Sequence, residues 1–549
     1  MRRHDLLSWY ETNLPVKERK QRGHFSTPPL LVERILDACG YTPDRDLSGV
    51  RVLDPACGSG NFIVGAAHRL LTAGKCRELS YDACIALVKH NIWGFDPDPV
   101  ACFLAEMQLQ MVINTVGTGF ITSASGWNAE ADVINPVPTV HVHQADGLAL
   151  AWEQGETFDL FLANPPYLAA KNNDLSGYRS TQKRGQADSY LLFLDLALRV
   201  VRPNGWIGLV LPDPFLARTN ATRERQLLLA ETTVHHLWHL AGVFAAHVGA
   251  VVLIAQKYPP AKLHTVSWTR EKWEPEADAI NPVPTKGINP IPQSLFLNQS
   301  HAELCYLLGT VQGTLVGQLH IYVNMASEAG QNRFIPLSAL VSIRRGEELG
   351  KESKLLSARS PDQFEGDWYP VLRGGVDIHP YEPPIAQCWI AREAVVKPLE
   401  CYLAPKLLIV KSTGCLQATL DVQGHVVLQT LYLLSLRNEK GEIDQLYFLL
   451  ALLNSRLLRE YVYVLHTAYK WVQPQIEQHV LARLPIPTLE ADERYEIIAC
   501  AKQLREMYNQ KDASQERRRE ILGIHEQIEH AVCMLYRRGL HPASGVHCG

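Results

Sequence analysis

The residues best suited to chemistry form the string Asn164-Pro165-Pro166-Tyr167, directly after an apolar run at residues 157–163. Two consecutive prolines restrict the backbone at the end of that run, where the strands of a parallel sheet bind ligands. The side-chain oxygen of Asn164 and the carbonyl oxygen of Pro165 can accept hydrogen bonds from one amino group, which keeps its lone pair available for attack. Tyr167 offers an aromatic face to a planar base. An ordinary strand-ending turn is the alternative.

A glycine-rich string, DPACGSGNF at residues 54–62, joins a short apolar run to a helical pattern. Its glycines let the backbone approach a ligand closely, and the first turn of the following helix favours a negatively charged group. Asp96 ends the next apolar run, where nucleotide-binding folds place an acid against ribose hydroxyls; a helix N-cap is its alternative role. Asp146 is a candidate partner for an adenine amino group, with a turn residue as the alternative. Together these residues predict a site for a nucleoside-type cofactor.

Both strings need a sheet that holds them at one edge. Five apolar runs of strand-like length occur in the first half of the chain, and helical spacing of apolar residues separates several of them. The runs cover residues 51–53, 91–95, 157–163, 206–211 and 250–255, and the helical patterns cover residues 62–71 and 190–201. This alternation predicts an α/β fold with a parallel, doubly wound sheet.

Composition limits the class of protein. The chain has 549 residues, of which 46% are hydrophobic and 20% charged, which excludes disorder throughout and allows two or three domains. The net charge of −4 excludes a basic coat for nucleic acid, so phosphate contacts must come from local clusters. The 12 cysteines form no CxxC pair, and neither a secretory signal nor a membrane-length apolar stretch is found, so we expect a reduced, soluble, cytoplasmic protein.

His235, His236 and His239 imitate metal-ligand spacing without a glutamate between them, so no metal is expected.

A proline-rich segment divides the chain. Many prolines and little periodic pattern between residues 258 and 293 predict a connection between domains. The second half mixes strand-like runs with long helical patterns at residues 445–464 and 495–538, which predicts an α+β domain. The expected parts are a first domain, a connection and a second domain, at residues 1–260, 261–295 and 296–549.

In this order, the strings DPACGSGNF, GFD, ADG and NPPY resemble the class I S-adenosylmethionine-dependent amino-methyltransferases. More narrowly, they resemble the gamma group of DNA adenine-N6 methyltransferases of the TaqI type, whose first cofactor motif is matched by GHFSTPP at residues 23–29. The resemblance in motifs covers roughly residues 20–260. It implies a Rossmann-like methyltransferase sheet, S-adenosylmethionine as the cofactor and double-stranded DNA as the partner.

The resemblance also implies roles for individual residues. Asn164, Pro165, Pro166 and Tyr167 would form the catalytic motif, in which Asn164 and Pro165 orient the target amine. Tyr167 and Phe244 would stack on the base, although the residues after Phe244 depart from the small polar residues usual in the group. The cofactor pocket would be lined by Thr27, Asp54, Cys57, Gly58, Gly60, Asp96, Asp146 and Pro166.

The implied reaction needs no covalent enzyme intermediate. Cytosine-C5 chemistry would use a nucleophilic cysteine in a Pro-Cys pair, and the chain has no such pair. Instead the amine would attack the sulfonium methyl directly and in line, so that catalysis depends on positioning. Because a duplex hides the amine in the base stack, the base would have to be extruded.

Local groups of basic residues are candidates for contacts with DNA. They follow the catalytic motif and a later strand, at Lys171, Lys183, Arg184, Arg218, Arg223 and Arg225. The second half resembles the target-recognition domains of Type IIG and Type I restriction–modification systems. Its short strands and loops could read base edges in the major groove through Arg344, Arg345, Lys351, Arg373 and Lys411. Solvated charged loops and an accessory folding domain are the alternatives.

We therefore expect a site-specific DNA methyltransferase that acts on the N6 amine of adenine, within a restriction–modification or phage-defence system. Its partners would be duplex DNA and cognate restriction or defence proteins, and the chain is compatible with a monomer. N4-cytosine methylation, methylation of RNA or a protein amide, and a specificity protein with an inactive methyltransferase half are the alternatives. No nuclease domain is expected ahead of the first cofactor motif.

Overall fold

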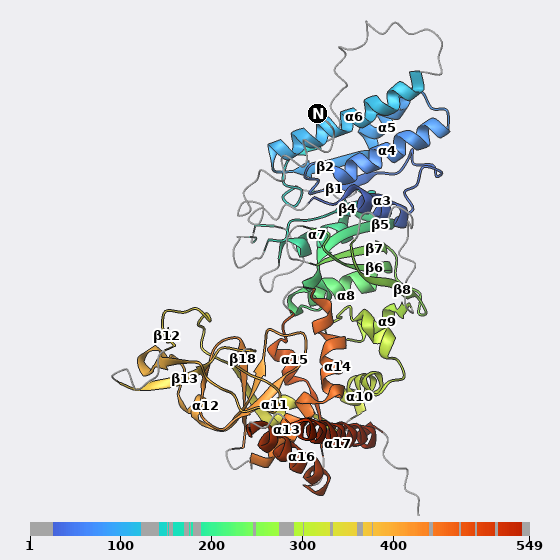
Figure 1. The fold of residues 1–549 in the computed structure, drawn as a ribbon. Coiled ribbons are helices and arrows are strands. Elements are labelled where there is room, and N and C mark those ends of the chain that lie inside the picture. The colour runs from blue at the N-terminus through green and yellow to red at the C-terminus, as the bar shows by residue number, and fades with distance from the viewer. Residues whose placement is uncertain are drawn as a thin grey trace, which may run out of the picture. The chain divides into compact units, whose positions relative to one another are not determined.

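The computed structural model divides the chain into two compact units, Met1–Tyr306 and Leu307–Gly549. The units are described separately (Figure 1). The structure describes residues 26–121, 142–150, 152, 157–168, 175, 177–178, 188–244, 249–273, 290–299, 301–329, 333–358, 366–375, 377–438, 443–471, 474–488, 491–510 and 514–540. In these ranges, no helix combines the length and the apolar character needed to cross a membrane.

The first unit is built on a nine-stranded sheet. Its strand order is β3-β2-β1-β4-β5-β7-β6-β8-β9, and the strands from β3 to β5 are parallel. Strand β7 runs antiparallel to both β5 and β6. The bounds are β1 Val52–Asp54, β2 Ile92–Asp96, β3 Val142–Gln144, β4 Phe158–Ala163, β5 Val201–Pro212, β6 Thr233–Ala241, β7 Ala250–Gln256, β8 Thr265–Lys272 and β9 Ile291–Pro292. A large, mainly parallel sheet with helices confirms the predicted α/β class.

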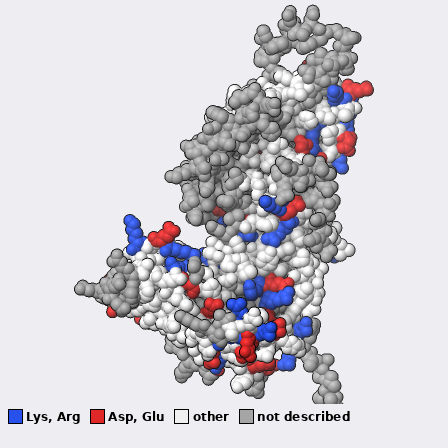
Figure 2. Space-filling view, viewed as in Figure 1, with Lys and Arg blue, Asp and Glu red and all other residues white. Residues whose placement is uncertain are grey.

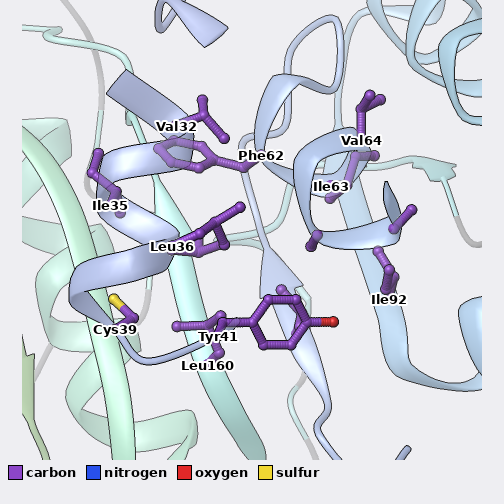
Figure 3. Close-up of a cluster of buried hydrophobic side chains, with 14 of the residues drawn as sticks. Val32, Ile35, Leu36, Cys39, Tyr41, Phe62, Ile63, Val64, Ile92 and Leu160 are labelled. Carbon is purple, nitrogen blue, oxygen red and sulfur yellow. The ribbon is translucent and has the colours of Figure 1, made fainter. Parts of the chain in front are cut away.

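Helices cover this sheet as the apolar periodicity predicts. Helices α4, α5 and α6 pack together beside β1 and β2, while α7 packs against β4 and β5 (Figure 1). The bounds are α3 Pro29–Ala38, α4 Asn61–Cys76, α5 Tyr81–Asn91, α6 Pro99–Ile121, α7 Ser189–Val200, α8 Thr222–Glu231 and α9 Gln293–Leu297. Leu36 of α3 and Phe62 of α4 join Ile92 of β2 and Leu160 of β4 in one buried cluster (Figure 3).

The proline-rich segment contributes to the sheet. Strand β8 lies between residues 261 and 295 and pairs in parallel with β6, so that His236 lies opposite Ser267. Strand β9 pairs with the start of β8, where Val266 lies opposite Ile291. Part of the segment that the prolines predict to be a connection is therefore sheet in the first unit. The functional boundaries at residues 260 and 295 stay a prediction.

Among the described residues, the second unit contains three smaller sheets. One four-stranded sheet has the order β11-β18-β15-β16 and is antiparallel throughout. A second sheet has the order β12-β14-β13-β17, and β10 pairs with β19. The bounds are β10 Phe334–Pro336, β11 Val341–Arg345, β12 Leu356–Ser357, β13 Trp368–Leu372, β14 Cys388–Ala391, β15 Lys406–Val410, β16 Ala418–Asp421, β17 Val426–Val427, β18 Leu431–Leu436 and β19 Pro485–Pro487.

Long helices complete this unit, as the sequence predicts. The apolar pattern at residues 445–464 forms two helices, because Ser455 ends the first and caps the second through the N–H of Leu458. The pattern at residues 495–538 likewise forms two helices, α16 and α17. The bounds are α10 Leu315–Ala329, α11 Leu337–Leu340, α12 Glu400–Leu403, α13 Ile443–Asn454, α14 Arg456–Leu465, α15 Gln478–Ala482, α16 Ala491–Asn509 and α17 Gln515–Leu540.

A buried ionic network lies inside the second unit. Lys406 Nζ is 2.6 Å from Asp421 Oδ2, and His425 Nδ1 is 2.9 Å from Asp421 Oδ1. Lys406 also donates to the carbonyl oxygen of Tyr402. Burial raises the pKa of Asp421, but its bond with His425 and the charge of Lys406 outweigh that effect and hold the pKa below its ordinary value. The network links β15 to β16 and the turn after it.

Candidate active site

The carboxyl ends of three neighbouring strands bring the predicted site residues together. Strand β1 pairs in parallel with β2 on one side and β4 on the other, with Val52 opposite both Ile92 and Leu160. Asp54 and Asp96 are the last residues of β1 and β2, and Asn164 follows the last residue of β4. The acids and the Asn-Pro-Pro-Tyr string therefore emerge at the same edge of the sheet, where open α/β sheets bind ligands.

The glycine-rich loop after β1 is held by its neighbour strand. The N–H of Cys57 donates to the carbonyl oxygen of Phe95 at 2.9 Å, and the N–H of Gly58 donates to Asp96 Oδ2 at 3.0 Å. Gly60 has a φ of 97°, and a Cβ there would lie 2.8 Å from the Cβ of Ala105. A Cβ at Gly58, by contrast, would meet nothing within 4 Å. The backbone at Gly58 is therefore open to an approaching ligand, whereas the backbone at Gly60 packs closely against Ala105 of α6.

Asp96 connects this loop to the start of α6. Its second oxygen, Oδ1, accepts from the N–H of Asp98 at 2.9 Å. The N–H of Val100 in the first turn of α6 donates to Asp98 Oδ1 instead, so Asp98 takes the capping role considered for Asp96. Asp96 therefore accepts backbone N–H groups from both the glycine-rich loop and the start of α6, which fixes its carboxylate at this edge of the sheet.

Asp54 is a buried acid with one local hydrogen bond. Its side chain is 1% exposed, and Oδ1 accepts from the N–H of Ala56 at 3.1 Å. Burial raises the pKa of Asp54 well above its ordinary value, and the charge of Asp96 adds to this rise. A cationic group placed beside Asp54 would reverse that effect. The pair of acids therefore suits a cofactor that carries positive charge.

Two side-chain amides link the glycine-rich loop to its surroundings: one to the GHFSTPP string and one to α6. Asn61, the first residue of α4, donates to Ser26 Oγ at 2.8 Å and to the carbonyl oxygen of Thr27 at 2.7 Å. Thr27 itself is buried. Gln108 of α6 donates to the carbonyl oxygen of Ser59 at 2.5 Å. Of the GHFSTPP string, residues 23–25 lie outside the described residues.

Asp146 has a tyrosine partner that sequence reasoning missed. The N–H of Leu148 donates to Asp146 Oδ1 at 3.0 Å, and the hydroxyl of Tyr178 donates to Oδ2 at 2.6 Å. This bond raises the pKa of Tyr178 to about 12. A Cβ on Gly147 would lie 2.2 Å from the carbonyl oxygen of Pro55, so glycine is required beside Asp146. The acid predicted to receive an adenine amino group already receives a hydroxyl donor.

In the Asn-Pro-Pro-Tyr string, the first and last side chains are hydrogen bonded to each other. Pro165 is buried, and Asn164, Pro166 and Tyr167 are half-buried. The Tyr167 hydroxyl is 3.2 Å from Asn164 Oδ1 and 3.3 Å from the carbonyl oxygen of Val210, so its proton has two acceptors. Burial raises the pKa of Tyr167, which keeps the hydroxyl protonated and able to donate. The Asn164 oxygen that would receive a target amine is therefore one of two acceptors for Tyr167.

Ser189, the first residue of α7, holds the backbone of this string. Its Oγ donates to the carbonyl oxygen of Pro166 and accepts from the N–H of Leu168 at 2.9 Å. Its own N–H donates to the carbonyl oxygen of Leu168 at 3.0 Å. Ser189 is 2% exposed. Sequence reasoning missed it because a serine at a helix start has a local explanation as part of a cap.

The remaining predicted site residues have different environments. Phe244 is 7% exposed and belongs to the buried cluster that contains Ile92 and Leu160. Arg344 is exposed and its Nη1 contacts Cys401 Sγ, whereas Arg345 is half-buried. Three predicted DNA contacts, Lys171, Lys183 and Arg184, lie outside the described residues.

One expectation is wrong: Arg225 does not face solvent. It is fully buried, and its guanidinium donates to the carbonyl oxygens of Phe215, Arg218, His301 and Ala302 at 2.8–3.0 Å. These four acceptors replace water around the charge, so the residue joins α8 to two loops rather than binding phosphate.

The three histidines of β6 have separate surroundings. His239 is buried and its Nδ1 lies 2.6 Å from the Tyr306 hydroxyl, while the His235 ring lies against Trp206. In the described part of the chain, no group of three or more His, Cys, Asp or Glu side chains is arranged to hold a metal ion. On the face drawn in Figure 2, coloured basic and acidic side chains are interspersed rather than gathered in one continuous basic area.

Comparison with known proteins places relatives on both halves of the chain. Residues 90–244 match the family described as Eco57I restriction-modification methylase, and residues 369–486 match the TaqI-like C-terminal specificity domain. The chain is 27% identical over 227 residues to the Type II methyltransferase M.BstVI of Geobacillus stearothermophilus, a match that covers 40% of this chain and 38% of that protein. It is 25% identical over 357 residues to M.TthHB8I of Thermus thermophilus, covering 61% of this chain and 73% of that one. The chain therefore spans less than half of M.BstVI.

Solved structures share the fold. The Type IIL restriction-modification enzyme MmeI in complex with DNA has a TM-score of 0.64 and 12% identity, covering 98% of this chain and 79% of that one. DrdV in its DNA complex has a TM-score of 0.57 and 11% identity, covering 91% of this chain and 58% of that one. The two family matches confirm the resemblance inferred from the motifs: a region that matches the restriction-modification methylase family is followed by a region that matches the TaqI-like specificity domain.

Proposed function

We propose that this chain is a DNA methyltransferase of the restriction–modification type, which transfers a methyl group from S-adenosylmethionine to the N6 amine of an adenine extruded from duplex DNA. The observation that carries the proposal is the common edge of β1, β2 and β4, where the glycine-rich loop, two acids and the Asn-Pro-Pro-Tyr string meet. The relatives named above support DNA as the substrate. A separate restriction or defence protein is the proposed companion.

The cofactor residues fit a nucleoside that carries positive charge. S-adenosylmethionine supplies an electrophilic methyl group on a sulfonium. Asp54, whose pKa burial raises, gains a favourable interaction from a nearby cation. Asp96, the acid at the end of β2, is the proposed acceptor for the ribose hydroxyls, and the open approach at Gly58 admits a ligand against the backbone. Asp146 accepts the adenine amino group in place of the Tyr178 hydroxyl.

The target amine is oriented by two acceptors at the end of β4. Asn164 Oδ1 and the carbonyl oxygen of Pro165 each accept one of its N–H groups, which directs the nitrogen lone pair towards the methyl group. The N–CH₃ bond forms as the S–CH₃ bond breaks, and the methylated amine releases one proton to solvent. When the amine binds Asn164, the Tyr167 hydroxyl retains the Val210 carbonyl as its acceptor. The tyrosine therefore adjusts without leaving a buried polar group unpaired.

Stacking offsets part of the cost of base extrusion. Unstacking a base costs a few kcal/mol. Stacking on one aromatic ring returns about 1–3 kcal/mol. Tyr167 supplies that ring beside the amine acceptors. Phe244 is the second proposed stacking residue, and its burial in the apolar cluster means that it must present one ring face when the base enters.

The proposal is tested with the full chain, tritium-labelled S-adenosylmethionine and unmethylated genomic DNA. We expect label to enter DNA with the wild-type protein and to be lost with Asn164→Ala, while calorimetry shows that Asn164→Ala still binds the cofactor. Label transfer by Asn164→Ala at the wild-type rate would contradict the role of Asn164. If the wild type shows neither cofactor binding nor label transfer, the proposed function is contradicted and a specificity protein without activity is favoured.

A further inference from the structure

Basic side chains lie at one end of the four-stranded sheet β11-β18-β15-β16 of the second unit. Arg345 is the last residue of β11, and Lys411 follows the last residue of β15. Both strands pair with the start of β18: Arg345 lies opposite Tyr432, and Ile409 lies opposite Tyr432 on the other side. Because β11 and β15 both run antiparallel to β18, Arg345 and Lys411 leave the sheet at the same end.

A second segment of the chain brings a third cation and a carboxylate to this end. The N–H of Ile476 donates to the carbonyl oxygen of Lys411 at 3.0 Å, and the Tyr432 hydroxyl donates to the carbonyl oxygen of Ile476 at 3.2 Å. Glu477 follows directly, and its Oε1 is 3.9 Å from Lys470 Nζ. Arg345, Lys411 and Lys470 form what we call the basic cluster.

The basic cluster has more positive than negative charge. The carboxylate of Glu477 contacts both Lys470 and His479, whose Nδ1 is 3.4 Å from Glu477 Oε2. In the described ranges, the side chains of Arg345 and Lys411 have no ion pair, and Arg345 Nε is buried without a hydrogen-bond partner. Burial lowers the pKa of Lys411, the charges of Arg345 and Lys470 lower it further, and Glu477 opposes them.

Three other cations of the second unit are paired with carboxylates, unlike Arg345 and Lys411 of the basic cluster. Arg373, another basic residue in a strand-end position, lies 3.2 Å from Asp377 Oδ1 and also donates to Gln387. Lys406 is paired with Asp421, and Lys502 is paired with Asp444 at 2.5 Å. The half-buried charges of Arg345 and Lys411 have no such partner among the described residues, and they cost free energy in the absence of a bound anion. An anion bound at the basic cluster would remove that cost.

We propose that the basic cluster binds a phosphate group of the DNA backbone and so positions the specificity region on the duplex. The ammonium groups of Lys411 and Lys470 are compact charges with rotatable donors, which suit a phosphate better than the fixed donor pattern of a base edge. The proposal rests on the proposed function, because it takes DNA as the ligand. It assigns these residues to affinity and register rather than to the choice of sequence.

The test is the salt dependence of DNA binding by the full chain. A fluorescein-labelled 30-base-pair duplex of mixed sequence is titrated by anisotropy between about 0.05 and 0.2 M NaCl. Lys411→Met and Lys470→Met are each expected to reduce the slope of log K against log salt by about 1. Across that fourfold range of salt, the wild type then loses about 3.5-fold more affinity than either variant. Lys502→Met is the matched control, since its lysine lies outside the basic cluster and is paired closely with Asp444 at 2.5 Å, and it should keep the wild-type slope.

The outcomes separate this inference from the proposed function. Lys411→Arg retains the charge and should keep the slope, which distinguishes loss of charge from loss of packing. If the wild type methylates DNA but Lys411→Met and Lys470→Met both bind with the wild-type slope, the phosphate site is wrong and the proposed function stands. If the wild type neither binds nor methylates the DNA, both the phosphate site and the proposed function are wrong. Circular dichroism and a thermal midpoint equal to that of the wild type verify that each variant is folded.

Discussion

Removal of the Ser189 hydroxyl tests whether the proposed catalytic role of the Asn-Pro-Pro-Tyr string depends on its backbone support. Ser189→Ala deletes two hydrogen bonds, one to the Pro166 carbonyl oxygen and one from the Leu168 N–H. A net loss of about 1 kcal/mol for each bond gives about 2 kcal/mol of lost stability. The larger effect is on positioning, because Pro166 follows directly on Asn164 and Pro165. A displacement of about 1 Å at reacting groups can reduce the rate about 100-fold.

The assay is single-turnover methyl transfer with saturating cofactor and DNA. We expect Ser189→Ala to reduce the rate constant by about 10- to 100-fold. The cofactor Kd should change much less than the rate constant, because the Ser189 hydroxyl bonds Pro166 and Leu168 rather than the glycine-rich loop after β1 or the acid at the end of β2. Ser189→Thr, which keeps the hydroxyl, should recover part of the lost rate.

A matched control separates positioning from general stability. Ser455 is also fully buried, and its Oγ likewise donates to a carbonyl, that of Leu452 at 2.6 Å, and accepts from an N–H, that of Leu458 at 3.3 Å. Ser455→Ala therefore removes the same two kinds of bond in the second unit. Equal rate constants for Ser189→Ala and Ser455→Ala would refute the positioning role.

Three further predictions concern the buried polar groups. Arg225→Met leaves four carbonyl oxygens without their shared donor and should lower the free energy of unfolding by about 3 kcal/mol or more in a urea titration; an unchanged midpoint would contradict this. Tyr178→Phe removes a competing donor from Asp146 and should tighten cofactor binding about fivefold by calorimetry; weaker binding would show that the hydroxyl assists the cofactor. Because the native pKa of Asp421 is lowered, its contribution to stability is present above the ordinary carboxyl pKa and is lost as the pH falls through the native value. Asp421→Asn should abolish that pH dependence and cost about 3–5 kcal/mol at neutral pH, since Lys406 stays buried without its partner; wild-type stability across the pH range would exclude this role.

Residue types at the sheet edge are predictable because backbone geometry restricts them. Gly60 needs its left-handed φ and the space beside Ala105, and Gly147 needs to pass the Pro55 carbonyl, so few other residues fit. The apolar runs that become β1, β2 and β4 carry enough periodicity to place these turns at one edge. The order of short strings therefore predicts the fold class and the position of the site.

Contacts between distant segments could not be predicted in the same way. Ser189 and Pro166 are 23 positions apart, and Arg225 and Ala302 are 77 positions apart. A serine or an arginine is compatible with a solvated surface as well as with a buried bond, so neither residue type reveals its partner. The prediction of a connection at the proline-rich segment missed β8 for a related reason. Pairing with β6 stabilises β8, and the local sequence pattern does not reveal this pairing.

The most direct test of the account is the identity of the methylated nucleoside. Unmethylated DNA is incubated with the full chain and S-adenosylmethionine, digested to nucleosides and separated by liquid chromatography with mass spectrometry. We predict N6-methyl-2′-deoxyadenosine with the wild-type protein and its loss with Asn164→Ala. Methyl groups on the N4 amine of cytosine would assign the same site to a different base, and the absence of any methylated nucleoside would contradict the account.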